Sequence, residues 1–266
     1  MFFTKKKDAL PVPIQDDYEI INEKNKVPLG VNNLPLVIKW DYSKKQHLIV
    51  FRHRLEDNPY LNNNTITEML IDNLLFLNKH EEHQNLCFGV DLLKVTFNME
   101  LPFFHRVLTN IENYHSFIDE VERKAIGEVR LDQNSNIQSE KPEIFLFVAD
   151  MDSIMEKNPT AEINVWTNLW SIAEQYSNIH LIILVGMKQN IPKDILHNSM
   201  SLLIGGSISS EDQGYFFGRE LTTINQEEKC NMCITQTEFG LEQFFPFYPD
   251  KIRQFLLRGI QTHRGE

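Results

Sequence analysis

The stretch HLIVFRHRLEDNPYLNNNTITEML, residues 47–70, decides the fold, because it predicts a strand, a long turn and a helix in that order. Its first five residues, HLIVF, form a short run rich in β-branched and aromatic side chains, as strands do. Thr65 and Glu68 have the spacing of a helix-capping box, and the apolar residues after them recur at helical spacing. A strand, turn and helix in this order is the place where many α/β proteins bind a phosphate.

Strand-like and helix-like segments alternate along the rest of the chain. We expect strands at 36–40, 47–51, 86–90, 143–149, 180–186, 201–206 and 233–239. We expect helices from residue 65, as one or two helices within 103–126, and over 161–176, 193–198 and 250–260, with a polar loop at 132–142. Strands separated by helices imply a parallel sheet. The predicted class is α/β: a doubly wound, mostly parallel sheet with helices on both faces.

Length and composition are those of one globular domain with an extension. The chain has 266 residues, 42% hydrophobic and 24% charged. Residues 1–35 carry four prolines and predict a linker or lead-in segment with one short strand at 18–21, so that 36–266 form the domain. The net charge of −11 argues against a nucleic-acid surface, which needs clustered Lys and Arg.

The compartment is predicted from the cysteines and from the apolar runs. The chain has three cysteines, and its first residues, MFFTKKKDALPVP, lack the apolar segment of a secretion signal. Both features favour a reducing compartment. No apolar run approaches the roughly 20 residues that span a bilayer, so we expect no direct membrane insertion of this segment.

Ligand sites on parallel sheets lie beyond the carboxyl ends of the strands. The turn after Phe51, the residues after Ala149 and the residues after Val185 should therefore lie near one another. The first of these segments lacks the residues of a phosphate-binding loop, whose glycines and lysine close around phosphate oxygens. No glycine occurs between residues 30 and 89 and no lysine between residues 45 and 79.

The turn instead begins with Arg52, His53 and Arg54. An exposed polar loop is the favoured interpretation of this segment, and a residual phosphate site is the alternative. The second segment follows an apolar strand with Asp150 and Asp152. Two solvent-facing acids at a strand end are the favoured interpretation. Alternatively, Asp150 could hold a metal ion, but no glutamate follows to serve as a base.

The third segment begins with Val185 and Gly186, and neither offers a side-chain hydrogen bond. We therefore predict no catalytic residue.

Two further clusters carry possible chemistry. Cys230 and Cys233 form a C-x-x-C pair, but no second ligand pair completes a zinc site, and the pair runs into a predicted strand rather than a helix. Small core or edge residues are the favoured interpretation. His80 and His83 could bind a metal as a pair, but a solvated helix end is favoured. We predict no metal site.

Five segments, in this order, resemble the FtsK/SpoIIIE-type P-loop ATPases, and more narrowly the C-terminal ATPase module of type VII secretion coupling proteins. They are VPLGVNN (27–33), QHLIVF (46–51), PEIFLFVADMDSIM (142–155), NIHLIILVG (178–186) and ILHNSMSLLIGGSISSEDQGYFFG (195–218), the last ending in an expected polar loop. The resemblance implies a RecA-like fold on the cytoplasmic side of a membrane-anchored complex. It also implies two kinds of partner, namely neighbouring ATPase modules of the same coupling protein and small helical secreted proteins.

The departures from this family fall at its functional positions. The Walker A glycine, lysine and threonine have no counterparts, and Ala149 stands where the Walker B aspartate is expected. We therefore expect a vestigial nucleotide cleft formed by the arginines and histidine at 52–54 with Asp150 and Asp152. Binding of ATP and Mg²⁺, which the parent family uses, should be weak or absent.

Three functions remain open. The favoured one is a non-catalytic module for substrate recognition and for regulation of neighbouring ATPase modules. The alternative is a divergent but active ATP-hydrolysing translocation motor, with Arg52 or Arg54 in place of the lysine and Asp150 on Mg²⁺. A metal-dependent hydrolase that uses Asp150, Asp152 and histidines is the third.

Overall fold

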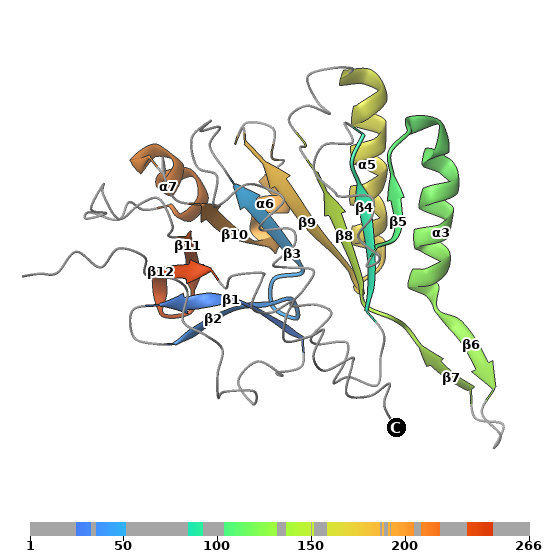
Figure 1. Cartoon of the computed structure of the whole chain (residues 1–266), viewed down its shortest axis with the longest axis horizontal. Helices are drawn as coiled ribbons and strands as arrows, with labels where there is room; N and C mark the ends of the chain where they lie inside the picture. Colours follow the sequence, from blue (N-terminus) through green and yellow to red (C-terminus); the bar gives the residue numbers. More distant parts are fainter. Residues whose placement is uncertain are drawn as a thin grey trace, which may run out of the picture.

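The computed structural model describes residues 25–32, 36–51, 85–92, 104–131, 137–149, 151, 159–186, 188, 191, 193–204, 209–218 and 233–246. A parallel sheet forms the centre of this part of the chain (Figure 1). Its strands are β3 (His47–Phe51), β4 (Leu86–Val90), β5 (Phe104–Leu108), β8 (Ile144–Val148), β9 (Ile179–Val185) and β10 (Ser199–Ile204). They lie in the order β10-β3-β9-β8-β4-β5, and each neighbouring pair is parallel.

The strand order reverses beside β3. From β3 the chain passes over to β4 and β5, returns through β8 and β9, and then crosses to β10 on the other side of β3. Such a reversal creates a crevice at the carboxyl ends of the strands, where α/β proteins bind ligands.

Four antiparallel strands extend the sheet beyond β10. In order they are β11 (Cys233–Thr237), β12 (Gly240–Pro246), β1 (Lys26–Asn32) and β2 (Val37–Asp41). β1 belongs to the segment expected as a lead-in, yet Val27 and Leu29 are fully buried. The folded core therefore begins before residue 36.

The described helices pack on one face of the sheet. They are α3 (Tyr114–Ile126), which follows a short 3-10 turn η1 (Ile111–Asn113), α5 (Pro159–Gln175), α6 (Lys193–Asn198) and α7 (Ser210–Phe217). Side chains alternate between the two faces of a strand, so Ile49 and Phe51 of β3 meet these helices. β8 and β9 are buried along their whole length, as expected for strands covered on both faces.

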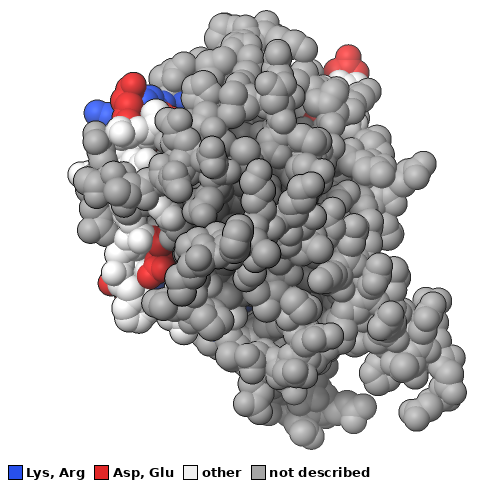
Figure 2. All heavy atoms as spheres, turned by 60° about the vertical axis from the view of Figure 1, so that its left-hand side comes forward, with Lys and Arg blue, Asp and Glu red and all other residues white. Residues whose placement is uncertain are grey.

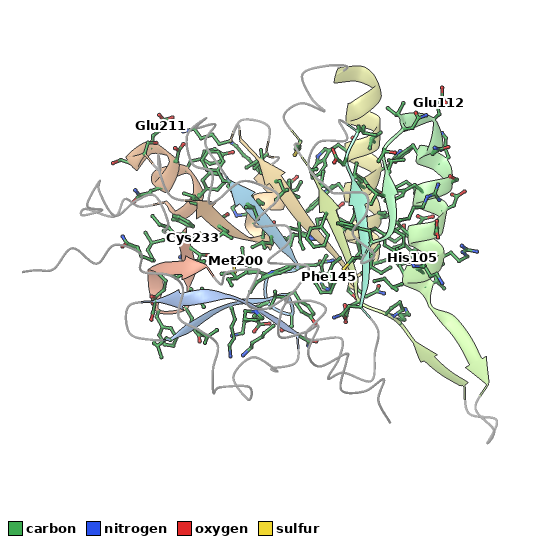
Figure 3. All side chains as sticks on the ribbon, in the orientation of Figure 1. His105, Glu112, Phe145, Met200, Glu211 and Cys233 are labelled. Atoms are coloured by element: carbon green, nitrogen blue, oxygen red, sulfur yellow. The ribbon has the colours of Figure 1, made fainter. Side chains whose placement is uncertain are left out.

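The β1–β2 hairpin covers part of the other face. Trp40 packs with its ring edge against Phe145 of β8, with the ring centroids 6.0 Å apart. Figure 3 shows Phe145 and Met200 between the core strands and this hairpin, and both belong to the same buried cluster. Among the described residues, this face is thus covered by strands, whereas the helix expected from residue 65 lies outside the described part.

The α/β class and most predicted elements are confirmed, but three segments differ. The region 103–126, expected as one or two helices, begins with strand β5, because FHRVL pairs in parallel with β4 at the border of the sheet. The expected loop 132–142 contains β7 (Ile137–Glu140), which pairs with β6 (Glu128–Leu131) in a hairpin that projects from the end of α3 (Figure 1). The polar segment before Gly218 forms helix α7 instead of a loop.

No helix in the described part of the chain is both long enough and apolar enough to cross a bilayer.

Candidate functional site

The carboxyl ends of β3, β9 and β8 lie side by side and form what we call the carboxyl rim. Phe51 at the end of β3 is paired with Val185 at the end of β9, and Val148 of β8 is paired with Ile183. Figure 1 shows the arrows of these three strands pointing toward the same end of the sheet. The strand ends therefore lie together as expected, whereas most of the residues that follow them lie outside the described part of the chain.

The predicted cleft residues themselves, Arg52, His53, Arg54, Asp150 and Asp152, lie outside the described residues. The structure fixes the strand ends from which they follow. At the β8 end, Ala149 is buried, and its backbone N–H donates to the carbonyl of Val90 at 2.9 Å. At the β9 end, Val185 is buried as well. The described ends of β8 and β9 therefore carry aliphatic side chains.

An acid that the sequence reasoning missed lies on the next strand. Asp91 directly follows β4 and is 2% exposed, and its backbone N–H donates to the carbonyl of Leu108 at 2.9 Å. The signal for it was an acid placed directly after a buried apolar strand, the same pattern that pointed to Asp150.

A cation that the sequence reasoning also missed lies just beyond β9. The ammonium of Lys188 contacts the carboxylates of Glu211 at 2.6 Å and Asp212 at 3.0 Å (Figure 3 labels Glu211 on α7). The side chain of Asp212 is 5% exposed, whereas that of Glu211 is 82% exposed. We call these three residues the Lys188 clasp.

Helix α7 is fixed to the carboxyl rim at several points. Its first turn closes in a capping box, in which the Asp212 N–H donates to Ser209 Oγ at 3.0 Å and the Asp212 carboxylate accepts from Ser209. Tyr215 donates its hydroxyl hydrogen to the carbonyl of Lys188 at 3.0 Å. Phe216 packs on Phe51, the last residue of β3, with the ring centroids 4.8 Å apart.

The charges of the clasp stabilise one another. The hydrogen bond to Glu211 raises the pKa of Lys188 above its usual range, and Asp212 adds to this effect against the opposing effect of burial. Burial alone would raise the pKa of Asp212, but hydrogen bonds from Ser209 and Lys188 outweigh it and hold that pKa below its ordinary value. The shifts in pKa therefore favour the charged forms of both Lys188 and Asp212.

Two buried histidines lie at the opposite end of the same strands. His47 begins β3, and its Nδ1 accepts the backbone N–H of Leu181 at 3.1 Å, so this nitrogen carries no proton. His180 contacts the carbonyl of Gln46 at 3.0 Å and the carboxylate of Glu143 at 2.7 Å. A five-residue strand separates this group from the carboxyl rim by roughly 15 Å. These histidines serve the core rather than the rim.

The described member of the cysteine pair, Cys233, has no reactive thiol. Cys233 is 1% exposed within β11, and burial raises its pKa to about 12, whereas Cys230 lies outside the described residues. A thiol that keeps its proton is neither a nucleophile nor a metal ligand. His80 and His83 also lie outside the described part, and no three metal-ligating side chains cluster within that part.

Comparison with known proteins rests on structure. No protein-family profile matches this sequence, and no curated protein sequence matches it. The strand order and the helices are those of a RecA-like α/β fold, and the solved structures that share it include FtsK/SpoIIIE-type ATPases.

Three solved structures illustrate the likeness. The conjugation coupling protein TcpA of pCW3, solved as a monomer with ATPγS, is 15% identical with a TM-score of 0.61, covering 92% of this chain and 74% of TcpA. EssC ATPases 2 and 3 from Geobacillus thermodenitrificans are 14% identical with a TM-score of 0.62, covering 90% of this chain and 49% of that one. Thermomonospora curvata EccC ATPases 2 and 3, in complex with a signal sequence peptide, are 16% identical with a TM-score of 0.52, covering 84% of this chain and 40% of the EccC chain.

This chain spans less than half of the EssC and EccC chains that it resembles. At these identities the likeness establishes the fold.

Proposed function

We propose that this chain is a non-catalytic ATPase-fold module of a type VII secretion coupling protein, which recognises secretion substrates and regulates neighbouring ATPase modules. The observation that carries the proposal is the carboxyl rim. The fold brings three strand ends together where a triphosphate would bind, yet the sequence supplies no glycine and no lysine in the turn after Phe51.

The chemistry of phosphoryl transfer explains why these losses matter. In P-loop ATPases the backbone of a glycine-rich turn and a lysine cradle the β- and γ-phosphates, and hydroxyl and acidic side chains hold Mg²⁺. Here Ala149 and Val185 end the two neighbouring strands. The described cation nearest in sequence to the β9 end, Lys188, is already bound by two carboxylates.

The choice of partners follows from the structural neighbours and the charge. A signal sequence peptide is bound in the EccC structure, and this supports the proposal that the present chain binds a segment of a secreted protein, for which we propose small helical proteins. Among the described residues visible in Figure 2, basic side chains lie beside acidic ones without a broad basic patch, and the net charge is −11. Both features suit protein partners on the cytoplasmic side of a secretion complex better than nucleic acid.

Calorimetric titration with ATP and Mg²⁺ tests the non-catalytic part. We expect no heat of binding at micromolar protein and no phosphate release above the buffer rate, because the sequence after Phe51 lacks the glycines and the lysine of a phosphate-binding loop. Micromolar affinity, or phosphate release that Asp150→Asn abolishes, would establish the divergent motor instead. The double variant Arg52→Ala/Arg54→Ala tells whether any binding uses the arginines.

Binding of a purified small helical secreted protein tests the recognition part. Fluorescence anisotropy of the labelled protein should show saturable binding whose affinity does not change when ATP and Mg²⁺ are added. Binding that needs nucleotide would contradict the proposal even if the fold is intact.

A further inference from the structure

The Lys188 clasp lies at the rim where this fold places its ligands. Lys188 follows β9 closely, and β9 is the direct neighbour of β3 at the reversal of strand order. Phe216 on α7 touches Phe51, the last residue of β3. The two acids that bind Lys188 are therefore carried by a helix that packs on this end of the sheet (Figure 1).

The contacts of Lys188 have the chemistry of a lysine that binds a phosphate. The Lys188 ammonium, at the carboxyl rim, donates hydrogen bonds to carboxylate oxygens at 2.6 and 3.0 Å, the range of charge-assisted hydrogen bonds. Phosphate oxygens would make the same contacts. The difference is that both anionic groups belong to the chain itself.

We propose that Glu211 and Asp212 act as a built-in anion on Lys188, an autoinhibitory contact that prevents an external phosphate group from binding there. The proposal deepens the proposed function and rests on it, because a module that binds no nucleotide has no phosphate to fix the position of Lys188 at the carboxyl rim. In this chain Glu211 and Asp212 fix that position.

Geometry explains why a free anion does not displace the clasp. Asp212 is almost fully buried and is also tied to Ser209, so it is already in place and loses little freedom by contacting Lys188. An external phosphate would leave the Asp212 charge buried without its cation, which is strongly unfavourable. It would also bring a third anionic group beside two carboxylates, and like charges at this range repel.

The test frees the lysine while it keeps the helix cap. In Glu211→Gln/Asp212→Asn both acids become neutral amides of nearly the same shape, and the Asn oxygen can still accept from Ser209. Pyrophosphate is the probe, and its affinity is measured by calorimetry together with the shift in Tm. We expect the double variant to bind pyrophosphate at least about tenfold more tightly than the wild-type chain. Adding Lys188→Ala to the double variant should remove the gain.

A matched control comes from an exposed ion pair elsewhere. Lys44 and Glu238 lie 3.6 Å apart, with both side chains 68% exposed. Glu238→Gln also removes a carboxylate beside a lysine and changes the net charge, although Lys44 keeps its contact with Asp41 at 3.9 Å, and it should leave pyrophosphate affinity unchanged. If it gives the same gain as the clasp variant, charge alone explains the effect and the proposal is wrong.

Two results separate this proposal from the proposed function. A double variant that melts cooperatively but shows no gain in pyrophosphate affinity overturns the clasp as an autoinhibitory contact and leaves the non-catalytic module standing. ATP binding by the wild-type chain overturns the non-catalytic module. Should the double variant fail to fold, Glu211→Gln alone, at an exposed position, must still give a smaller gain, and no gain overturns the proposal.

Discussion

At the scale of single residues, two glycines of α7 have opposite roles. Gly214 lies inside the helix, and a Cβ added there would meet nothing within 4 Å. Gly218 follows the helix with φ 69°, the left-handed conformation that favours glycine, and its N–H donates to the carbonyl of Gly214. One glycine therefore weakens the helix, and the other ends it.

Alanine at these two positions should change stability in opposite directions. Gly214→Ala should raise the free energy of unfolding by about 0.5–1 kcal/mol, because glycine loses more backbone freedom than alanine in a helix. Gly218→Ala should lower it by about 1 kcal/mol, because a Cβ is strained at positive φ. Urea unfolding followed by circular dichroism measures both. Equal signs for the two variants would contradict the opposite roles assigned to these two glycines.

His47 should make the protein sensitive to acid. Burial lowers the pKa of His47 from 6.5 to about 3, with a further decrease from nearby His180. Below pH 6.5 the unfolded chain takes up a proton that the folded chain refuses, so stability falls as pH decreases toward 3. The contribution is about 1.4 kcal/mol for each pH unit in this window.

His47→Asn tests this dependence, because its side-chain oxygen can still accept the N–H of Leu181 without titrating. Unfolding free energies measured between pH 7 and pH 5 should fall less steeply in the variant than in the wild-type chain. Parallel profiles would show that another group causes the acid sensitivity.

At the scale of elements, the sequence predicts most clearly the strands that are buried on both faces of the sheet. β8 and β9 are continuous apolar runs, which are recognisable without knowledge of their neighbours. β5 was missed because FHRVL contains an arginine and pairs only at the border of the sheet, where Arg106 bonds to Glu120 of α3. Its strand conformation is set by its partner rather than by its composition.

The candidate site likewise has one part that the sequence predicts and one part that it does not. The meeting of the three strand ends was predictable, because parallel topology alone places them together. The Lys188 clasp was not, because its members are 23 and 24 residues apart and are joined only when α7 packs on β3. The spacing of Ser209 and Asp212, typical of a capping box, was the one local signal for α7.

The β1–β2 hairpin should be a large source of stability for the sheet face that it covers. Trp40 is fully buried and donates its indole N–H to the carbonyl of Lys45 at 2.7 Å. Trp40→Ala should cost about 3–5 kcal/mol, because it leaves a cavity beside Phe145. Leu36→Ala, at a 55% exposed position next to the same strand, should change stability by less than about 0.5 kcal/mol.

Chemical unfolding monitored by tryptophan fluorescence and circular dichroism compares these two variants. A cost for Trp40→Ala as small as that for Leu36→Ala would mean that the hairpin is not part of the cooperative core.

At the scale of the whole molecule, the first and last described strands close the domain. β1 pairs with β12, so strands from the two ends of the described chain complete one sheet. β5, which with β2 borders the sheet, is tied to α3 by Arg106 and Glu120, whose nitrogen and oxygen lie 2.7 Å apart. The fold is thus held from both sides of the parallel core.

The pairing of β1 with β12 also decides how the domain responds to mechanical force. The two strands are antiparallel, with Gly30 opposite Pro246, so the start of β1 and the finish of β12 lie at the same end of the pair. Tension along the chain from either side therefore loads their hydrogen bonds one after another, as in a zipper, instead of all together in shear. Each such bond contributes only about 1 kcal/mol. When the chain is pulled from both sides, we therefore expect the described part of the domain to separate first between β1 and β12.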